Sequence, residues 1–272
     1  METFYIDLKV LPIGEISIFI RKWGRGPKVL LTHGWLDTSL RWLYLGESLA
    51  EHYEVWALDL PGFGQTLALP LHHTTLETYA AILAELLYHI TDGKELHGLL
   101  GHSMGGLLSL LLLKNSLRAK RVIVCGAPVT GVKHVKPLAD DADLVMKCLM
   151  AFRALPVGLR IPLVKFGSFV ALRSWHVAKN ERRTLSDIDV RAAAVLLKQV
   201  CTCNLLDQLK PSSADVLVIR GQHDFFTSRL ASEQLAENLN GVFYEFQGAH
   251  HAPMIEQPAH SYQVVKRFLD RV

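Results

Sequence analysis

Short apolar runs alternate with longer helical patterns along most of the chain, and this alternation constrains the fold more than any other feature. The run Arg121–Gly126 is almost uninterrupted, as is typical of a strand that helices cover on both faces. Strands are predicted at Ile16–Ile20, Lys28–Leu31, Glu54–Asp59, His97–Leu100, Arg121–Gly126, Val216–Arg220 and Val242–Phe246. The sequence therefore predicts an α/β fold with a mostly parallel, doubly wound sheet.

Segments with apolar residues at helical spacing lie between these strands. The clearest is Leu76–Ile90, where Thr75 is a suitable N-cap and Gly93 a suitable stop. Further helices are predicted at Leu40–Glu51, Leu107–Asn115, Ser228–Leu239 and Pro258–Val272.

One stretch interrupts the alternation. Between Gly131 and Pro211 no strand bounded by turns is evident, and helix-like segments replace it. These are Ala139–Leu155, Leu163–Leu172 and Asp189–Leu209. We therefore expect a core domain made of residues 1–131 and 211–272, with residues 132–210 inserted as a helical cap.

The segment Gly101–Gly105 matches the pattern Gly-x-Ser-x-Gly, with Ser103 at its centre. An apolar strand precedes it and an apolar helix follows, so the chain must turn sharply at the serine. Glycine on either side relieves crowding in such a turn. Ser103 would then project above the sheet edge at a helix N-terminus, where the helix dipole and the free backbone N–H groups favour an oxyanion. This context predicts that Ser103 is a nucleophile.

With this elbow, the sequence resembles the α/β-hydrolase superfamily over essentially the whole chain. Five motifs follow in the order of that family: His33–Trp35, Asp59–Gly64, Gly101–Gly106, Gly221–Asp224 and His251–Pro258. The resemblance implies an α/β-hydrolase fold with a helical cap. The serine at the elbow excludes relatives with an aspartate nucleophile, such as haloalkane dehalogenases and epoxide hydrolases.

A serine nucleophile needs an adjacent base, and histidine serves near neutral pH. Two neighbouring candidates stand in the last motif. Aligning Ala252 and Pro253 with the family loop makes His251 the catalytic base, and His250 then occupies a position that is usually glycine. His250 remains the alternative.

The base in turn needs a carboxylate to orient it. Asp224 follows the strand Val216–Arg220 and preserves the order Ser, Asp, His of this fold. Asp207 and Asp215 precede that strand and would lie at its wrong end. Asp59 is expected to be structural in its Pro-Gly turn, and Asp37 is a possible pocket residue.

The resemblance also implies an oxyanion hole made of the backbone N–H groups of Trp35 and Met104. His33 is expected to brace the loop before Trp35. Trp35, His102 and Phe225 are predicted to line the substrate site, and His102 is expected to pack at the elbow rather than act as a second base.

The predicted cap combines apolar residues with spaced cations, namely Lys147, Arg153, Arg160, Lys165 and Arg173. One interpretation is an amphipathic cap whose cations face water. The other is an apolar tunnel for an acyl chain, with transient attachment to a membrane surface.

Composition narrows the function classes. A net charge of +3 without a dense basic run gives no support for nucleic-acid binding. The four cysteines have no metal-site spacing, and the N-terminal segment does not resemble a signal peptide, so we expect reduced thiols and a cytoplasmic protein. No apolar run is long enough for membrane insertion.

These features together predict a serine hydrolase of carboxylic esters or thioesters that works through an acyl-enzyme. No metal or organic cofactor is expected. The partner would be a small-molecule ester or thioester, and the protein a monomer or a homodimer. Acyl transfer and C–C bond hydrolysis on the same triad remain alternatives, as does a non-catalytic ligand-binding protein on the same fold.

Overall fold

The computed structural model describes residues 1–115, 117–155 and 188–271. Its centre is an eight-stranded sheet in the order β1-β2-β4-β3-β5-β6-β7-β8. The strands are β1 (Glu2–Val10), β2 (Gly14–Trp23), β3 (Lys28–Thr32), β4 (Glu54–Leu58), β5 (Leu96–His102), β6 (Ala119–Cys125), β7 (Asp215–Gly221) and β8 (Val242–Phe246). β1 and β2 are antiparallel to each other, β2 is antiparallel to β4, and all other pairs are parallel.

The structure confirms the predicted mostly parallel sheet and all seven predicted strands. It adds β1, which the sequence analysis did not predict. Ile6, Leu8 and Val10 of β1 are buried and alternate with exposed polar residues. This period of two is the pattern of an antiparallel strand with one solvated face, unlike the continuous apolar runs of the central strands.

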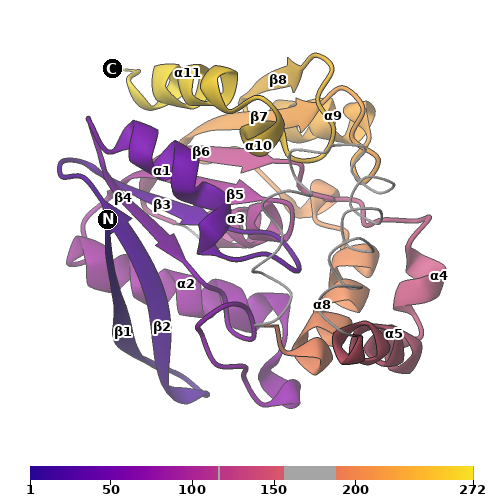
Figure 1. The fold of residues 1–272 in the computed structure, drawn as a ribbon. Helices are drawn as coiled ribbons and strands as arrows, with labels where there is room; N and C mark the ends of the chain where they lie inside the picture. Colours follow the sequence, from indigo (N-terminus) through magenta and orange to yellow (C-terminus); the bar gives the residue numbers. More distant parts are fainter. Residues whose placement is uncertain (116, 156–187, 272) are drawn as a thin grey trace.

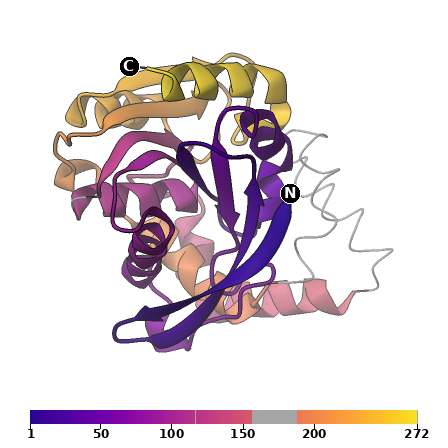
Figure 2. The same ribbon diagram turned by 90° about the vertical axis from the view of Figure 1, so that its left-hand side faces the viewer.

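Helices cover both faces of the sheet (Figures 1 and 2). One face packs against α2 (Leu76–Thr91), α3 (Met104–Lys114) and α9 (Arg229–Asn238), and the other against α1 (Leu43–Leu49) and α11 (Pro258–Leu269). The predicted caps are confirmed for α2, because the Thr75 side chain accepts from the Thr78 N–H and the helix ends at Asp92 just before Gly93. The central strands of the sheet are thus buried on both sides, whereas β1 keeps one solvated face.

Three α-helices lie in the described part of the chain between β6 and β7. They are α4 (Lys136–Ala139), α5 (Ala142–Ala154) and α8 (Val190–Thr202), while the helix predicted at Leu163–Leu172 lies outside the described residues. Asp189 caps α8 by accepting from the N–H groups of Arg191 and Ala192. A small apolar cluster holds these helices together, formed by Val132, Ala139, Val145, Ala194, Leu197 and Cys201.

Parallel pairing decides where the loops meet. β3, β5, β6, β7 and β8 run in the same direction, so their carboxyl ends share one edge of the sheet. Loops at this edge of an open α/β sheet form its binding crevice. Within the described residues, no helix is both long and apolar enough to cross a membrane.

Candidate active site

Ser103 occupies the turn between β5 and α3. Its backbone has φ 54° and ψ −115°, a conformation that non-glycine residues rarely adopt. The Ser103 N–H donates to the Cys125 carbonyl at the end of β6 at 2.8 Å, which fixes the turn against the neighbouring strand. Such strain, of order 1–3 kcal/mol, persists only where the surrounding structure imposes it.

Two glycines make the turn possible. A Cβ atom on Gly101 would lie 2.2 Å from the Gly105 carbonyl oxygen, and one on Gly105 would lie 2.4 Å from the Thr32 carbonyl oxygen. Both contacts are with backbone, which cannot move aside as a flexible side chain would. The sequence analysis predicted this need for glycine at positions 101 and 105.

The loop after β3 passes directly over the serine. A Cβ on Gly34 would lie 3.1 Å from the Ser103 Cβ, a contact tight enough that a larger residue at position 34 would have to displace its neighbours by a few tenths of an ångström. The backbone N–H groups of Trp35 and of Met104, the first residue of α3, donate to no acceptor in the described part of the chain. They are therefore available to a ligand, as the first N–H groups of a helix generally are.

His33 braces this loop. Its Nδ1–H donates to the Gly34 carbonyl at 2.8 Å, and its Nε2 accepts from the Leu60 N–H at 2.9 Å. Complete burial lowers the pKa of His33 to about 4, with the Asp59 carboxylate opposing the shift. The ring is therefore neutral at pH 7, as the tautomer with one donor and one acceptor requires.

The structure brings Asp224 and His251 together. Asp224 follows β7 and His251 follows β8, and His251 Nδ1 lies 3.0 Å from each carboxylate oxygen of Asp224. Both residues are more than nine-tenths buried. This contact fixes the ring orientation and places the proton on Nδ1, which leaves Nε2 free to accept one.

Asp224 is itself held by its own loop. Its carboxylate accepts from the Phe226 N–H at 2.8 Å and from the Thr227 hydroxyl at 2.7 Å. Burial raises the pKa of Asp224, but the charge and hydrogen bond of His251, with those from Thr227 and Phe226, outweigh it and lower the pKa overall. The sequence analysis missed Thr227, although an aspartate that accepts from N–H groups two and three positions later is a common turn.

Ser103 lies near this pair, although its hydroxyl makes no hydrogen bond to His251 within the described residues. Gly126 links Ser103 to the His251–Asp224 pair, because it directly follows Cys125, whose carbonyl accepts from the Ser103 N–H. A Cβ on Gly126 would lie 3.1 Å from His251 Cε1 and 3.3 Å from the Asp224 carboxylate. Catalytic hydrogen bonds are often long without substrate.

The alternative residues lie elsewhere. His250 bonds the Glu256 carboxylate at 3.1 Å and makes no hydrogen bond to Asp224. Asp59 accepts from the Ser39 and Gln65 N–H groups, and Asp37 is buried in an ion pair with Arg41. The two remaining candidates, Asp207 and Asp215, are exposed, and Asp215 begins β7 at the opposite edge.

Two of the residues predicted to line the substrate site, Trp35 and Phe225, make different contacts in the structure. The Trp35 indole N–H donates to the Ala193 carbonyl of α8 at 2.8 Å. Phe225 is 63% exposed and packs against His134 with ring centroids 4.0 Å apart and the rings tilted by 56°. Phe226, which sequence reasoning did not single out, packs on the His251 ring at 4.7 Å and joins the apolar cluster of α4, α5 and α8.

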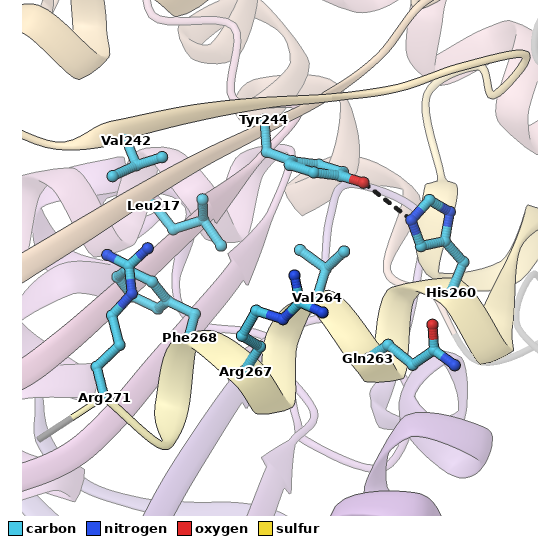
Figure 3. A pocket seen from close by; sticks show the side chains of 9 residues that line it. All are labelled: Leu217, Val242, Tyr244, His260, Gln263, Val264, Arg267, Phe268 and Arg271. Carbon is cyan, nitrogen blue, oxygen red and sulfur yellow. Dashed lines mark hydrogen bonds between the residues drawn. The ribbon is translucent and has the colours of Figure 1, made fainter.

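A separate groove lies between β8 and α11 (Figure 3). It has a volume of about 230 Å³, and its lining includes Tyr244, whose hydroxyl bonds His260 at 2.9 Å, together with Arg267 and Arg271. None of the predicted site residues lines this groove, so it is distinct from the candidate active site. Among the described residues, no group of three or more potential ligands is arranged to hold a metal ion.

Comparison with known proteins identifies the family. The model of the alpha/beta hydrolase family matches residues 29–262. A pimeloyl-[acyl-carrier protein] methyl ester esterase of Aeromonas hydrophila is 27% identical over 93% of this chain and all of that protein. Among solved structures, a thermophilic esterase from Thermogutta terrifontis superposes with a TM-score of 0.81 at 23% identity, over 98% of both chains. An esterase from Exiguobacterium antarcticum has the same TM-score at 20% identity, over 98% of this chain and all of that one.

Proposed function

The chain belongs to the alpha/beta hydrolase family, and from this premise we propose that it hydrolyses carboxylic esters or thioesters, with Ser103 as nucleophile, His251 as base and Asp224 as its orienting acid. One observation carries the proposal. The His251–Asp224 pair, at 3.0 Å from both carboxylate oxygens, lies at the sheet edge where Ser103 stands in a strained elbow.

The chemistry follows from this arrangement. Ser103 Oγ attacks the substrate carbonyl carbon while His251 Nε2 takes the hydroxyl proton. The carbonyl oxygen becomes an oxyanion, to which the N–H groups of Trp35 and Met104 donate. The C–O or C–S bond then breaks, and His251 returns the proton to the departing alcohol or thiol. Water, activated by His251, attacks the acyl-enzyme and regenerates Ser103.

The backbone donors are available because nothing within the described protein accepts from them. Loss of one such donor typically raises a barrier by about 3–4 kcal/mol. Asp224 contributes by keeping the proton on His251 Nδ1 and by stabilising the imidazolium that forms after proton transfer. No step in this sequence calls for a metal or an organic cofactor.

We further propose that the acyl group is apolar. Trp35 and Phe226 pack against the apolar cluster of α4, α5 and α8, and Phe226 also packs on the His251 ring. The Aeromonas relative is named for a methyl ester of an acyl chain on a carrier protein. A small-molecule ester or thioester with an apolar acyl chain fits both observations, and activity on p-nitrophenyl esters should rise with acyl length. Activity that stays constant or falls as the acyl chain lengthens would contradict the proposed apolar acyl group.

The direct test is a panel of esters, thioesters and lactones assayed with the wild type and with Ser103→Ala. We expect hydrolysis of at least one ester class and a fall in kcat of about 10⁴-fold or more in the variant. A Ser103→Ala protein that keeps activity within tenfold of the wild type would refute the proposed nucleophile.

A further inference from the structure

The main chain on both sides of His251 is bonded to one buried carboxylate. Glu256 Oε2 accepts from the His250 N–H at 2.8 Å, and Glu256 Oε1 accepts from the Ala252 N–H at 2.9 Å. The Glu256 side chain is only 7% exposed. Glu256 ends the short helix α10 (Pro253–Glu256), so its carboxylate reaches back over the start of that helix in the manner of a capping box.

The carbonyl of His251 has its own partner. His102 Nε2 lies 2.9 Å from the His251 carbonyl oxygen, and because a carbonyl only accepts, the ring nitrogen donates. The two imidazole rings are 4.9 Å apart between centroids. Burial, with the neighbouring charges of His251 and Arg41, keeps the pKa of His102 well below its usual range, so the ring is neutral.

His251 needs such support because no regular element carries it. Residues 247–252 form the loop between β8 and α10, and Asp224 contacts only the side chain of His251. A shift of about 1 Å in a catalytic group can cost 10²-fold in rate. A site is held to this tolerance only when surrounding bonds lock its main chain as well as its rotamer.

We propose that Glu256 and His102 are positioning residues that hold the main chain of His251 so that Nε2 faces Ser103. The inference rests on the proposed function, since it assigns a task in the same reaction. Three hydrogen bonds carry it, from residues 250 and 252 to Glu256 and from His102 to residue 251. His102 acts through His251 and does not touch the reacting atoms.

A pair of His102 variants isolates the first bond. His102→Leu removes the donor, and His102→Gln keeps an N–H near the place of Nε2. We expect kcat to fall about tenfold to 100-fold in the leucine variant with KM within twofold, and the glutamine variant to recover most of the loss. Because His102 is neutral, the acid limb of the pH–rate profile should not move in either variant.

His97 provides the matched control. It stands at the other end of the same strand, β5, and its Nε2 bonds the Leu269 carbonyl at 3.0 Å. His97→Leu therefore removes the same kind of bond far from His251, and kcat should stay at the wild-type value. Equal kcat in wild type and His102→Leu, or a glutamine variant no better than leucine, would overturn the role of His102.

Glu256→Gln tests the other two bonds. An amide offers one acceptor oxygen, so one of the two N–H groups beside His251 loses its partner. We expect kcat to fall about tenfold, and amide hydrogen exchange at His250 or Ala252 to accelerate at least tenfold, with the amides of β7 unchanged. Glu233→Gln, in an exposed pair with Arg229 on α9, is the control.

The exchange measurement needs no substrate, so it separates the two proposals. If the wild type hydrolyses no ester while Glu256→Gln loosens residues 250–252, the proposed function fails and the three bonds stand as a structural clamp. Unchanged exchange and unchanged kcat in Glu256→Gln would overturn the positioning role itself.

Discussion

At the scale of single residues, the candidate site depends on positions where there is little or no room for a Cβ atom. Ser103 has a positive φ, Gly101 and Gly105 allow backbone to approach within distances that a Cβ would forbid, and Gly34 leaves room for the Ser103 side chain. Gly126 is a fourth such position, with φ +58°, directly beside the His251 ring and the Asp224 carboxylate. Steric exclusion thus shapes the candidate site as much as hydrogen bonding does.

Gly126→Ala tests this view. The left-handed backbone costs an alanine roughly 1 kcal/mol, and its Cβ at 3.1 Å would push His251 by a few tenths of an ångström. We expect a modest loss in the free energy of unfolding and a fall in kcat of about tenfold or more. Urea unfolding and steady-state kinetics measure the two effects separately.

Gly14→Ala is the comparison variant. Gly14 also has a positive φ, of +96°, but a Cβ there meets nothing within 4 Å. It should lose stability and keep full activity. If Gly126→Ala also kept full activity, the contact with His251 would have no catalytic consequence.

The sequence alone was enough to predict Ser103, Asp224 and His251 as candidate catalytic residues, because each follows a strand in a short motif. The supporting contacts around these three residues were not predicted. Phe226 and His102 gain their partners only when loops far apart in the chain meet at the sheet edge, whereas Thr227 bonds Asp224 within one local turn. Spacing along a chain cannot show a hydrogen bond between residues 102 and 251.

At the scale of elements, apolar periodicity predicted the central strands well and the connections less well. The predicted helix Ala139–Leu155 corresponds to α5, Ala142–Ala154, and the preceding α4 was not predicted. The helix predicted at Asp189–Leu209 ends at Thr202. Both differences are in the segment between β6 and β7, where helices pack on one another and no sheet register fixes their ends. β1 was missed because its alternation of buried and exposed residues is weaker than a continuous apolar run.

One bond joins this segment to the candidate oxyanion loop, namely the Trp35 indole N–H to Ala193 in α8. Trp35→Phe keeps an aromatic ring and the backbone N–H but removes the indole bond to the Ala193 carbonyl. We expect the free energy of unfolding to fall by about 1 kcal/mol. KM should rise several-fold while kcat changes little, because α8 is displaced but the backbone donor remains.

Trp56→Phe supplies the control, since it also loses an indole hydrogen bond, to Glu54 at 2.9 Å on β4. It should lose similar stability with no change in KM. A Trp35→Phe enzyme with wild-type KM would show that this link does not shape the substrate site.

At the scale of the whole molecule, the parallel strands gather loops from the entire chain at one edge, and buried histidines tie those loops together. His33 connects the loop after β3 to the turn after β4, and His102 connects the elbow to the loop after β8. His33 must be neutral to make its bonds, because its Nε2 accepts, and burial keeps the pKa of His102 well below its usual range, so that ring is neutral as well. Protonation therefore opposes folding.

Stability should accordingly fall in mild acid. The pKa of His33 is about 4 in the folded protein and near 6.5 when unfolded, so between these values the unfolded chain binds more protons. The contribution is fully present above pH 6.5 and is lost as pH falls toward 4, by about 3 kcal/mol for His33. His102 adds a loss in the same direction.

Urea unfolding at several pH values between 7 and 4 measures this slope. His33→Gln offers Leu60 an oxygen that does not titrate in this range, so its slope should be shallower than that of the wild type. Identical slopes in the two proteins would contradict the assignment to His33.

The most direct test of the central claim is covalent labelling with a fluorophosphonate, followed by intact mass and peptide mapping. A Ser103 hydroxyl activated by His251 forms an O–P bond and expels fluoride, so we predict one phosphonyl group per chain, attached at Ser103 and absent from Ser103→Ala. An unlabelled wild type, or a label on any other residue, would contradict the account.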